Sequence, residues 1–346
     1  MKVFEMSLKI ITASMVLIVS SGLSVSAADQ IHIVGSSTVY PFSTVVAERF
    51  GRTSKFATPI VESTGTGGGF KLFCAGVANN TPSVVNASRA IKPSERALCA
   101  KNGVKNIIEV KIGYDGIVMA NARSAKNFNL GVRDIFMALA QNVPSGQGKL
   151  TANPYQRWKD VNPDLPDIKI EVLGPPPTSG TRDAFMELAM EAGCKKIPWI
   201  KELKKTDKKA YKRICHSMRE DGAYIDAGEN DNLIVQRLKA NPDVLGIFGF
   251  SFLDQNLDVV KAARINGIEA SFENIANNSY PISRPLFFYA KGEHMALIPG
   301  LMEFITEFTG DRAIGDEGYL SDRGLIPMPA AELEALRRQI ASQTSR

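Results

Sequence analysis

The chain has 346 residues, a formal net charge of +5 at pH 7 and 44% hydrophobic residues. That length allows two domains of ordinary size, and the composition is that of a globular protein. The mildly positive charge does not indicate a nucleic-acid partner, and none is expected.

The start of the chain has the pattern of a secretory signal peptide over residues 1–28. Lys2 and Lys9 supply a positive start, residues 10–25 form a mostly apolar run, and small residues end it at Ala28. The apolar run is short for a spanning helix, no second such run follows, and no cysteine lies near the cleavage region to carry a lipid. We therefore expect cleavage and a periplasmic mature protein; an uncleaved N-terminal anchor is the alternative.

Strand and helix signals alternate along the first part of the mature chain. Strands are predicted from short runs of apolar residues, and helices from apolar positions at helical spacing or from a Pro-Ser-Glu start. Alternation of this kind favours an α/β fold with a mainly parallel sheet and helices on both faces. The predicted strands are 31–34, 59–61, 83–87 and 107–110, and the predicted helices are 39–50, 68–76 and 93–99.

Two apolar segments, 107–121 and 280–289, are predicted to carry the chain between two α/β domains. Residues 29–112 and 284–346 would form domain I and residues 113–283 domain II, so the two segments are hinge crossings. Domain II is expected to contain strands at 168–173, 244–248 and 257–263 and helices at 182–192 and 232–239, while helices at 295–308 and 329–340 return to domain I.

Four cysteines are present: Cys74, Cys99, Cys194 and Cys215. An even number in an exported protein favours two disulfides. Of the three possible pairings we favour the sequence-local one, Cys74 with Cys99 and Cys194 with Cys215, and each bridge would stabilise by roughly 3 kcal/mol. Four buried free thiols are the alternative. The spacing contains no CxxC and no zinc signature.

Basic residues concentrate between Lys195 and Arg213. This run is typical of one solvated helix face, and a binding patch is the alternative.

Three short clusters of Gly, Ser and Thr fall between a predicted strand and a predicted helix, at residues 35–38, 64–70 and 178–182. A helix N-terminus offers unpaired backbone N–H groups and the positive end of the helix dipole, and glycine lets the backbone approach a ligand closely. Taken singly, each cluster is also explained as an ordinary helix cap or tight turn. Three of them converging on one point would form a cage for a small anion.

Two arginines lie beside these clusters. Arg89 follows the predicted strand 83–87, and Arg182 directly follows a Ser-Gly-Thr turn. The planar guanidinium suits phosphate and other oxyanions. A surface salt bridge is the alternative for each, but ligands of open α/β sheets bind near such strand ends, which favours a ligand role.

The chain lacks the motifs of common enzyme classes. The loop at 65–71 has neither the GxxxxGK[ST] spacing of a P-loop nor the GxGxxG of a dinucleotide-binding fold. None of the three histidines lies near a GxSxG elbow, and no HExxH or EF-hand loop occurs. We therefore expect no enzyme activity, no cofactor and no bound metal.

Four motifs are specific when taken together: VGSSTVYPF at 34–42, ESTGTGGGFKLFCAG at 62–76, NASRAIKPSE at 86–95 and PPPTSGTRDAF at 175–185. Through them, essentially the whole mature chain resembles the periplasmic phosphate-binding proteins of ABC transporters. The resemblance implies a two-lobed periplasmic-binding-protein fold that closes on a two-strand hinge around one buried anion. The phosphate-binding candidates that follow are Ser37, Thr38, Val39, Thr66, Gly67, Ser88, Arg89, Ser179, Gly180, Thr181 and Arg182.

The chain departs from the best-known members of that family at two positions. Arg89 stands where they carry an aspartate, which accepts a hydrogen bond from the protonated oxygen of phosphate and repels sulfate. Pro175 stands where they carry an arginine, a role that Arg182 would take over. Discrimination against sulfate then needs another acceptor, for which Glu62 and Asp115 are candidates; ordinary surface or hinge carboxylates are the alternative for both.

The sequence therefore predicts a monomeric exported receptor that binds inorganic phosphate with high affinity and delivers it to the membrane permease of an ABC transporter. Two alternatives remain. One is a receptor for another oxyanion such as sulfate, and the other is an exported adhesion or matrix protein that retained the receptor fold.

Overall fold

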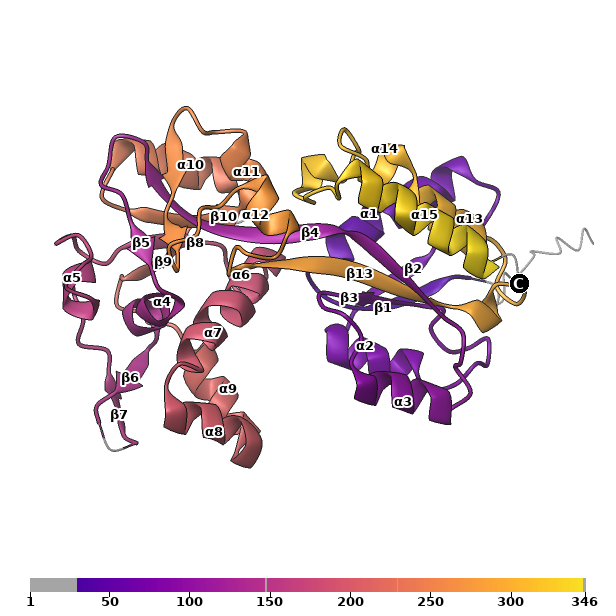
Figure 1. Cartoon of the computed structure of the whole chain (residues 1–346), viewed down its shortest axis with the longest axis horizontal. Helices are drawn as coiled ribbons and strands as arrows, with labels where there is room; N and C mark the ends of the chain where they lie inside the picture. The colour runs from indigo at the N-terminus through magenta and orange to yellow at the C-terminus, as the bar shows by residue number, and fades with distance from the viewer. Residues whose placement is uncertain (1–29, 147, 229, 345–346) are drawn as a thin grey trace, which may run out of the picture.

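The computed structural model describes residues 30–344, except 147 and 229. It has two lobes joined by two long strands, β4 (Ile107–Ala122) and β13 (Ser283–Lys291), which run side by side between them (Figure 1). These strands pair antiparallel along the whole length of β13. One sheet therefore passes through both lobes.

The first lobe is a sheet with helices on both faces. β1 (His32–Gly35) lies between β2 (Ile60–Ser63) and β3 (Val84–Ala87) in parallel pairings, and β13 pairs antiparallel with β3. In Figure 1, α2 and α3 lie below this sheet and α1, α13 and α15 above it. The helices of this lobe are α1 (Tyr40–Thr53), α2 (Thr66–Phe73), α3 (Pro93–Lys101), α13 (Leu301–Thr309), α14 (Asp311–Ile314) and α15 (Ala330–Thr344), with 3₁₀ turns at Gly292–His294 and Ser321–Arg323.

Aromatic side chains fill both faces of that sheet. On one face Phe50 packs edge-on against Phe304, with ring centroids 5.6 Å apart. On the other, the rings of Phe70 and Tyr289 lie 5.3 Å apart. Because successive residues of a strand point to opposite faces, Phe288 joins the first of these cores and Tyr289 the second.

The second lobe continues the same sheet beyond the hinge. β10 (Leu245–Gly249) and β11 (Val260–Ala262) pair antiparallel with β4, while β8 (Val172–Gly174) is parallel to β10 and β9 (Tyr224–Asp226) is parallel to β8. Two short ladders complete the strands: β5 (Asn129–Leu130) with β12 (Arg264–Ile265), and β6 (Asn142–Pro144) with β7 (Leu150–Ala152). The helices are α4 (Val132–Leu139), α5 (Trp158–Val161), α6 (Gly180–Phe185), α7 (Glu191–Cys194), α8 (Pro198–Thr206), α9 (Lys208–His216), α10 (Asp231–Ala240), α11 (Phe250–Asp254) and α12 (Phe272–Ala276).

The predicted two-lobed α/β fold is confirmed, with one correction to its sheet. Parallel pairings occur within each lobe, as expected, but the sheet is not mainly parallel: β13 pairs antiparallel with β3 and β4, and β4 pairs antiparallel with β10 and β11. One crossing leaves the first lobe and the other returns to it, so the two strands run in opposite directions.

The helix predicted at 182–192 is longer than expected. It begins at Gly180 and reaches Cys194, because a π-helical segment at Met186–Met190 joins α6 to α7 without a break. The turn at residues 175–179 is therefore followed by a helix of several turns, whose dipole points its positive end at that turn.

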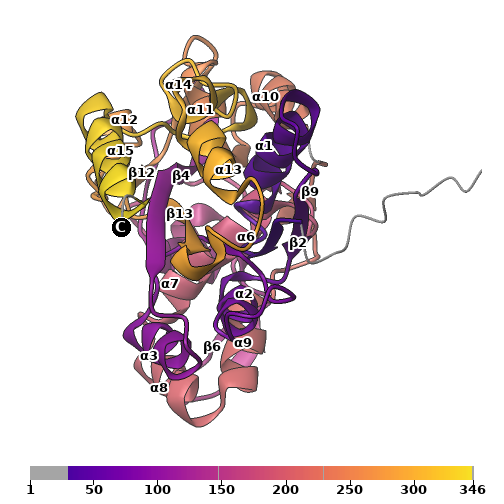
Figure 2. The same ribbon diagram turned by 90° about the vertical axis from the view of Figure 1, so that its right-hand side faces the viewer.

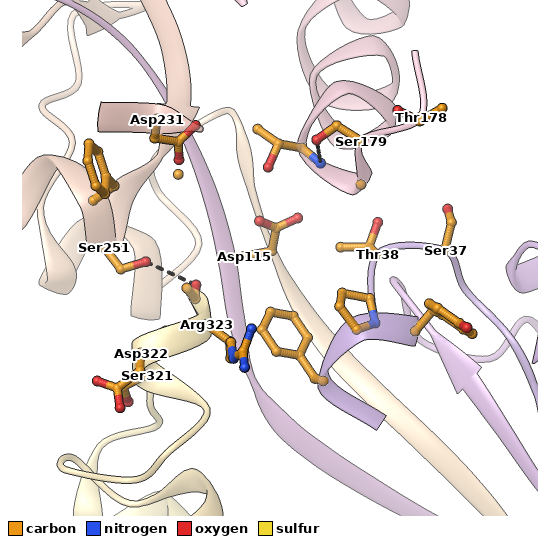
Figure 3. A pocket seen from close by; sticks show the side chains of 18 of the residues that line it. Ser37, Thr38, Asp115, Thr178, Ser179, Asp231, Ser251, Ser321, Asp322 and Arg323 are labelled. Carbon is orange, nitrogen blue, oxygen red and sulfur yellow. Dashed lines mark hydrogen bonds between the residues drawn. The ribbon is translucent and has the colours of Figure 1, made fainter. Parts of the chain in front are cut away.

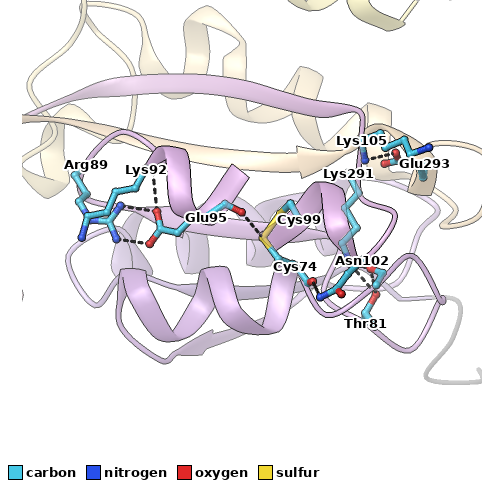
Figure 4. The surroundings of a disulfide bond; sticks show 11 residues. Cys74, Thr81, Arg89, Lys92, Glu95, Cys99, Asn102, Lys105, Lys291 and Glu293 are labelled. Carbon is cyan, nitrogen blue, oxygen red and sulfur yellow. Dashed lines mark hydrogen bonds and ion pairs between the residues drawn. A yellow bond between two sulfur atoms is a disulfide. The ribbon is translucent and has the colours of Figure 1, made fainter. Parts of the chain in front are cut away.

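Both predicted disulfides are present. Cys74 pairs with Cys99, with the sulfurs at 1.98 Å (Figure 4), and Cys194 pairs with Cys215 at 2.05 Å. The first ties the end of α2 to α3 and the second ties α7 to α9. Each bridge therefore lies within one lobe and closes a short loop.

The predicted leader, residues 1–28, lies outside the described residues, so its cleavage stays a prediction. Across the part of the chain that the structure describes, no helix combines the length and apolar character needed to cross a membrane. The finding applies to that part alone.

Gly35 ends β1 in a backbone conformation that other residues rarely adopt, with φ of 130°, and a Cβ there would lie 2.2 Å from the Asn86 carbonyl oxygen. We expect Gly35→Ala to lower the free energy of unfolding by roughly 2–4 kcal/mol, since backbone strain and overpacking add. Gly103→Ala is the control, because Gly103 has φ of 87° and nothing within 4 Å of the added Cβ. Urea denaturation measures both; equal losses would contradict the role of the Asn86 contact.

Candidate functional site

The turn after β1 carries Ser36 to Val39 and opens α1. Gly35 lets the chain pass close to β3, where the Ser36 N–H donates to the Asn86 carbonyl at 2.9 Å. The Val39 N–H donates to Ser36 Oγ at 3.4 Å, and Val39 itself is fully buried. Thr38 is also buried, at the edge of the gap between the lobes. The turn is therefore held against the sheet with Thr38 facing that gap.

The matching turn of the second lobe follows β8. Ser179 caps α6, since its Oγ accepts a hydrogen bond from the Thr181 N–H at 3.2 Å. Gly180 is the first residue of the helix, and a Cβ added to it would lie 3.5 Å from the Thr38 Cα. That distance is an ordinary van der Waals contact, so the helix N-termini of the two lobes lie close to each other at Gly180 and Thr38.

These two turns face one cavity of about 620 Å³ between the lobes (Figure 3). In that view the Asp115 side chain, from the hinge strand β4, points into the space between the turns. Five of the predicted ligands line the cavity: Ser37, Thr38, Ser179, Gly180 and Thr181.

Two hydrogen bonds connect the lobes beside that cavity. Ser37 Oγ donates to Asp183 Oδ2 at 2.8 Å, and Ser251 Oγ donates to the Gly324 carbonyl at 3.0 Å. The lobes therefore touch in this structure. The hydroxyl proton of Ser37 is donated to Asp183 across the contact between the lobes.

Arg284 links the hinge to the first turn and to the helix of the second lobe, and was not among the predicted site residues. It is 7% exposed on β13, directly opposite Asp115 on β4. Its guanidinium donates to Thr38 Oγ1 at 2.8 Å, to Glu187 Oε2 at 2.6 Å and to Asp115 Oδ2 at 3.4 Å. A buried cation is thus paired with two carboxylates and orients the Thr38 hydroxyl.

The two carboxylates predicted as acceptors lie in different surroundings. Asp115 lines the cavity, where burial raises the pKa of its carboxyl above the ordinary value, although Arg284 opposes that shift. Glu62 lies on β2 with its side chain 54% exposed and pairs with His32 at 3.0 Å. Of these two, the structure brings only Asp115 to the two turns.

A second cavity, of about 850 Å³, adjoins the same turns from the other side. Ser37 lines both cavities, and Gly65 and Arg182 line the second. The Arg182 guanidinium lies over the Tyr224 ring, 4.2 Å from its centroid, and its Nη1 is buried without a hydrogen-bond partner among the described residues. Arg182 therefore lies in the second cavity, while the hydroxyls of the neighbouring turn line the first.

The third predicted cluster lies at the start of α2. Its predicted ligands Thr66 and Gly67 line neither of the two cavities. Thr66 Oγ1 lies 3.1 Å from Ser88 Oγ and accepts the Ser88 N–H at 3.2 Å. Two predicted ligands from different strand ends are thereby brought together. Their hydroxyls hold the two loops of the first lobe to each other.

Arg89 forms an ion pair with a residue of its own lobe. Its two terminal nitrogens donate to the Glu95 carboxylate at 2.9 and 2.7 Å (Figure 4), and Glu95 also accepts the Lys92 N–H at 2.9 Å. Although burial raises the pKa of Glu95, these contacts outweigh it and hold that pKa below the ordinary value. Arg89 lines neither cavity. Its charge is therefore matched within α3, as the salt-bridge alternative expected.

The cavity between the turns is suited chemically to an oxyanion. It is lined by hydroxyl donors at two helix N-termini, and its charged lining residues are Asp115, Asp231, Asp322 and Arg323. A fixed set of donors can replace the hydration shell of an anion. Within the described residues, no group of three or more His, Cys, Asp or Glu is arranged to hold a metal ion.

Comparison with known proteins bears on the family. Residues 24–312 match the model of a protein family that is described as a PBP superfamily domain. The chain belongs to the PBP superfamily. Phosphate-binding protein PstS of Staphylococcus epidermidis is 32% identical over 295 residues, which cover 83% of this chain and 77% of that protein. Protein SphX of Synechococcus elongatus is 29% identical over 315 residues, covering 89% and 80%. The predicted membership among PstS-like proteins is confirmed.

Solved structures of this superfamily share the two-lobed fold. A possible phosphate binding protein from Planctomyces limnophilus superposes with a TM-score of 0.72 at 27% identity, covering 91% of this chain and 98% of its own. An ABC-type phosphate transport receptor from Vibrio cholerae gives a TM-score of 0.57 at 19% identity, covering 87% and 100%. The second likeness shows the fold alone.

The raised pKa of Asp115 predicts a pH-dependent stability. The folded form holds the Asp115 proton more tightly than the unfolded chain, so this contribution is present below the ordinary pKa of 3.8 and is lost as pH rises through the raised value. Asp115→Asn removes the titration. The urea midpoint of the variant should therefore improve relative to wild type as the pH rises above about 4. A difference between the two proteins that stays constant with pH would contradict the shift.

Proposed function

We propose that this chain is a receptor that binds inorganic phosphate in the cavity between its lobes and delivers it to the permease of an ABC transporter. The observation that carries the proposal is the meeting of two helix N-terminal turns, one from each lobe, where Gly180 lies against Thr38. The names of two relatives, phosphate-binding protein PstS and a possible phosphate binding protein, support the same ligand.

Thr38 and Thr181 are the central hydroxyl donors in this proposal. Thr38 Oγ1 accepts a hydrogen bond from Arg284, so its own proton is directed elsewhere and is suited to a phosphate oxygen. Thr181 belongs to the first turn of the helix that runs on to Cys194, whose positive dipole end favours an anion. These donors offset the loss of hydration when the anion is buried.

Asp115 is the proposed acceptor for the proton of hydrogen phosphate. It lies between the two turns, and in its ionised form it can accept a hydrogen bond from the protonated phosphate oxygen. Sulfate has no such proton and would meet the carboxylate with like charge. Asp115 would then take over, from a different strand, the role of the family aspartate whose place Arg89 occupies.

Lobe movement follows from the hinge. We assign residues 29–112 and 284–346 to one moving body and residues 113–283 to the other. The ligand contacts turns of both bodies, so it favours the conformation in which they approach. There is no chemical step, which agrees with membership of a family of solute receptors.

The proposed site of action is the periplasm, reached through the leader at residues 1–28. The receptor would work there as a monomer, with phosphate and the permease as partners and without nucleic acid or a cofactor. The lack of a spanning helix within the described residues is consistent with a mature protein released from the membrane.

The sulfate alternative is weakened by the position of Arg89. It was motivated by an extra positive charge in the site, but Arg89 is paired with Glu95 and lines neither cavity. The adhesion alternative is motivated by the basic segment 195–213, which lies on the surface of the second lobe. A receptor that binds an anion in the cavity and has a separate function at its surface would account for both the cavity and the basic segment.

We expect Thr181→Val to weaken phosphate binding by about 1–3 kcal/mol, because it removes a hydrogen bond to a charged ligand while keeping the volume of the side chain. Isothermal titration calorimetry on the mature protein freed of ligand measures the change. Thr306→Val, on the exposed side of α13, is the control and should bind as wild type does. An unchanged affinity in Thr181→Val would place the site elsewhere, and no binding by wild type would reject the proposed function.

Asp115→Asn should reduce the preference for phosphate over sulfate by about 1.5–3 kcal/mol, since a neutral amide no longer repels sulfate. Competition of sulfate against phosphate measures it. Asp322→Asn is the control, because Asp322 lines the same cavity from an exposed position. Sulfate exclusion that survives in Asp115→Asn would mean that another group recognises the phosphate proton.

A further inference from the structure

The hairpin of α8 and α9 concentrates the positive charge of the molecule. Residues 195–213 contain nine Lys or Arg and two Asp or Glu, a net charge of +7, which exceeds the +5 of the whole chain. The remaining residues together are thus slightly negative.

The fold directs most of these cations outward. The Glu191 carboxylate, with its side chain 14% exposed, forms ion pairs with three of the basic side chains. They are Lys195 at 2.9 Å, Lys204 at 3.1 Å and His216 at 3.2 Å. The Cys194–Cys215 disulfide fixes α9 against α7. Six exposed cations have no ion pair within the described residues: Lys196, Lys201, Lys208, Lys209, Lys212 and Arg213.

The first lobe adds a second basic region on the same side of the molecule. Residues 71–105, which include α3, carry six Lys or Arg and one Glu, a net charge of +5. In Figures 1 and 2, α2 and α3 of the first lobe and α8 and α9 of the second lie at the same end of the vertical axis. We call the exposed surface of residues 71–105 and 195–213 the basic face.

The opposite side is acidic. Residues 301–324, with α13 and α14, carry six Asp or Glu and two Arg, a net charge of −4. Both views place α14 at the end of the molecule away from α8 and α9. The protein therefore presents one positive and one negative side, and a negatively charged surface will attract the basic face.

The composition of the basic face favours a lipid surface over a protein partner. Protein interfaces have an aromatic and apolar centre and are depleted in lysine. Here most of the charge is lysine spread over two lobes, and residues 195–213 have no large hydrophobic side chain among the exposed ones. Leu72 and Leu98, on α2 and α3, are 44% and 37% exposed among these cations. Dispersed lysines with a few exposed apolar side chains suit anionic headgroups.

We propose that the basic face docks reversibly on the surface of a membrane that contains anionic phospholipids. Both lobes would contact the headgroups, since the face is divided between them. The contact is electrostatic, so it weakens as salt screens the lysines. It does not depend on which anion the cavity binds.

Co-sedimentation of the mature protein with vesicles tests this. We expect binding to vesicles of phosphatidylglycerol and phosphatidylcholine, loss of binding as salt is raised, and no binding to phosphatidylcholine alone. The variant Lys201→Gln, Lys208→Gln, Lys209→Gln should bind the anionic vesicles about 10- to 100-fold more weakly. Calorimetric phosphate binding and the urea midpoint of this variant should equal those of wild type, because the three side chains are exposed and remote from the cavity.

The matched control removes three exposed cations from the other side of the molecule, with Arg237→Gln, Lys239→Gln and Arg312→Gln. It has the same net charge as the hairpin variant and should bind vesicles within about twofold of wild type. Equal losses in the two variants would overturn the proposal in favour of unspecific charge attraction. Wild type that ignores the anionic vesicles but binds immobilised polyglutamate would overturn it in favour of an acidic protein partner.

Discussion

The pairing of Arg284 is the interaction on which the site depends. An isolated guanidinium in a buried hinge would be strongly destabilising, and this one is held by Asp115 on the neighbouring strand, by Glu187 of the second lobe and by the Thr38 hydroxyl of the first. The hinge, both lobes and the turn at Thr38 therefore share one buried charge. Moving the lobes apart would separate Glu187 from this cation, so lobe position and electrostatics are coupled.

That pairing also shapes the character of the cavity. Arg284 is neutralised by carboxylates, and Arg89 is matched by Glu95 outside the cavity. The two turns thus offer hydroxyl dipoles and helix N-termini, and Arg323 is the positively charged residue among those that line this cavity. Such a site selects a ligand by its hydrogen-bond pattern more than by its total charge. An ionised carboxylate at the centre favours an anion that brings a proton of its own.

Local patterns were enough for the architecture and for two of the three turns. The alternation of strands and helices predicted the lobes, and the capping residues around Ser179 and Thr38 predicted the surfaces that meet in the cavity. Arg284 was missed because its role depends on its register opposite Asp115, 169 residues away, which no local pattern encodes. Its one signal was a charged residue inside an apolar hinge segment. The partner of Arg89 was easier to predict, because it lies nearby in the sequence. Glu95 is the third residue of α3, a position that capping carboxylates often occupy.

The two disulfides separate rigidity from motion. Each closes a loop within one lobe, so no covalent bridge other than the chain itself crosses between the lobes. Oxidation therefore stiffens the helices that carry the lysines and leaves the bending of the β4–β13 ladder unrestrained. Reduction would act in the reverse sense, loosening the outer helices of each lobe while the hinge keeps its hydrogen-bonded strands. Disulfide formation in an oxidising compartment would thus make each lobe more rigid without restricting the bending of the hinge.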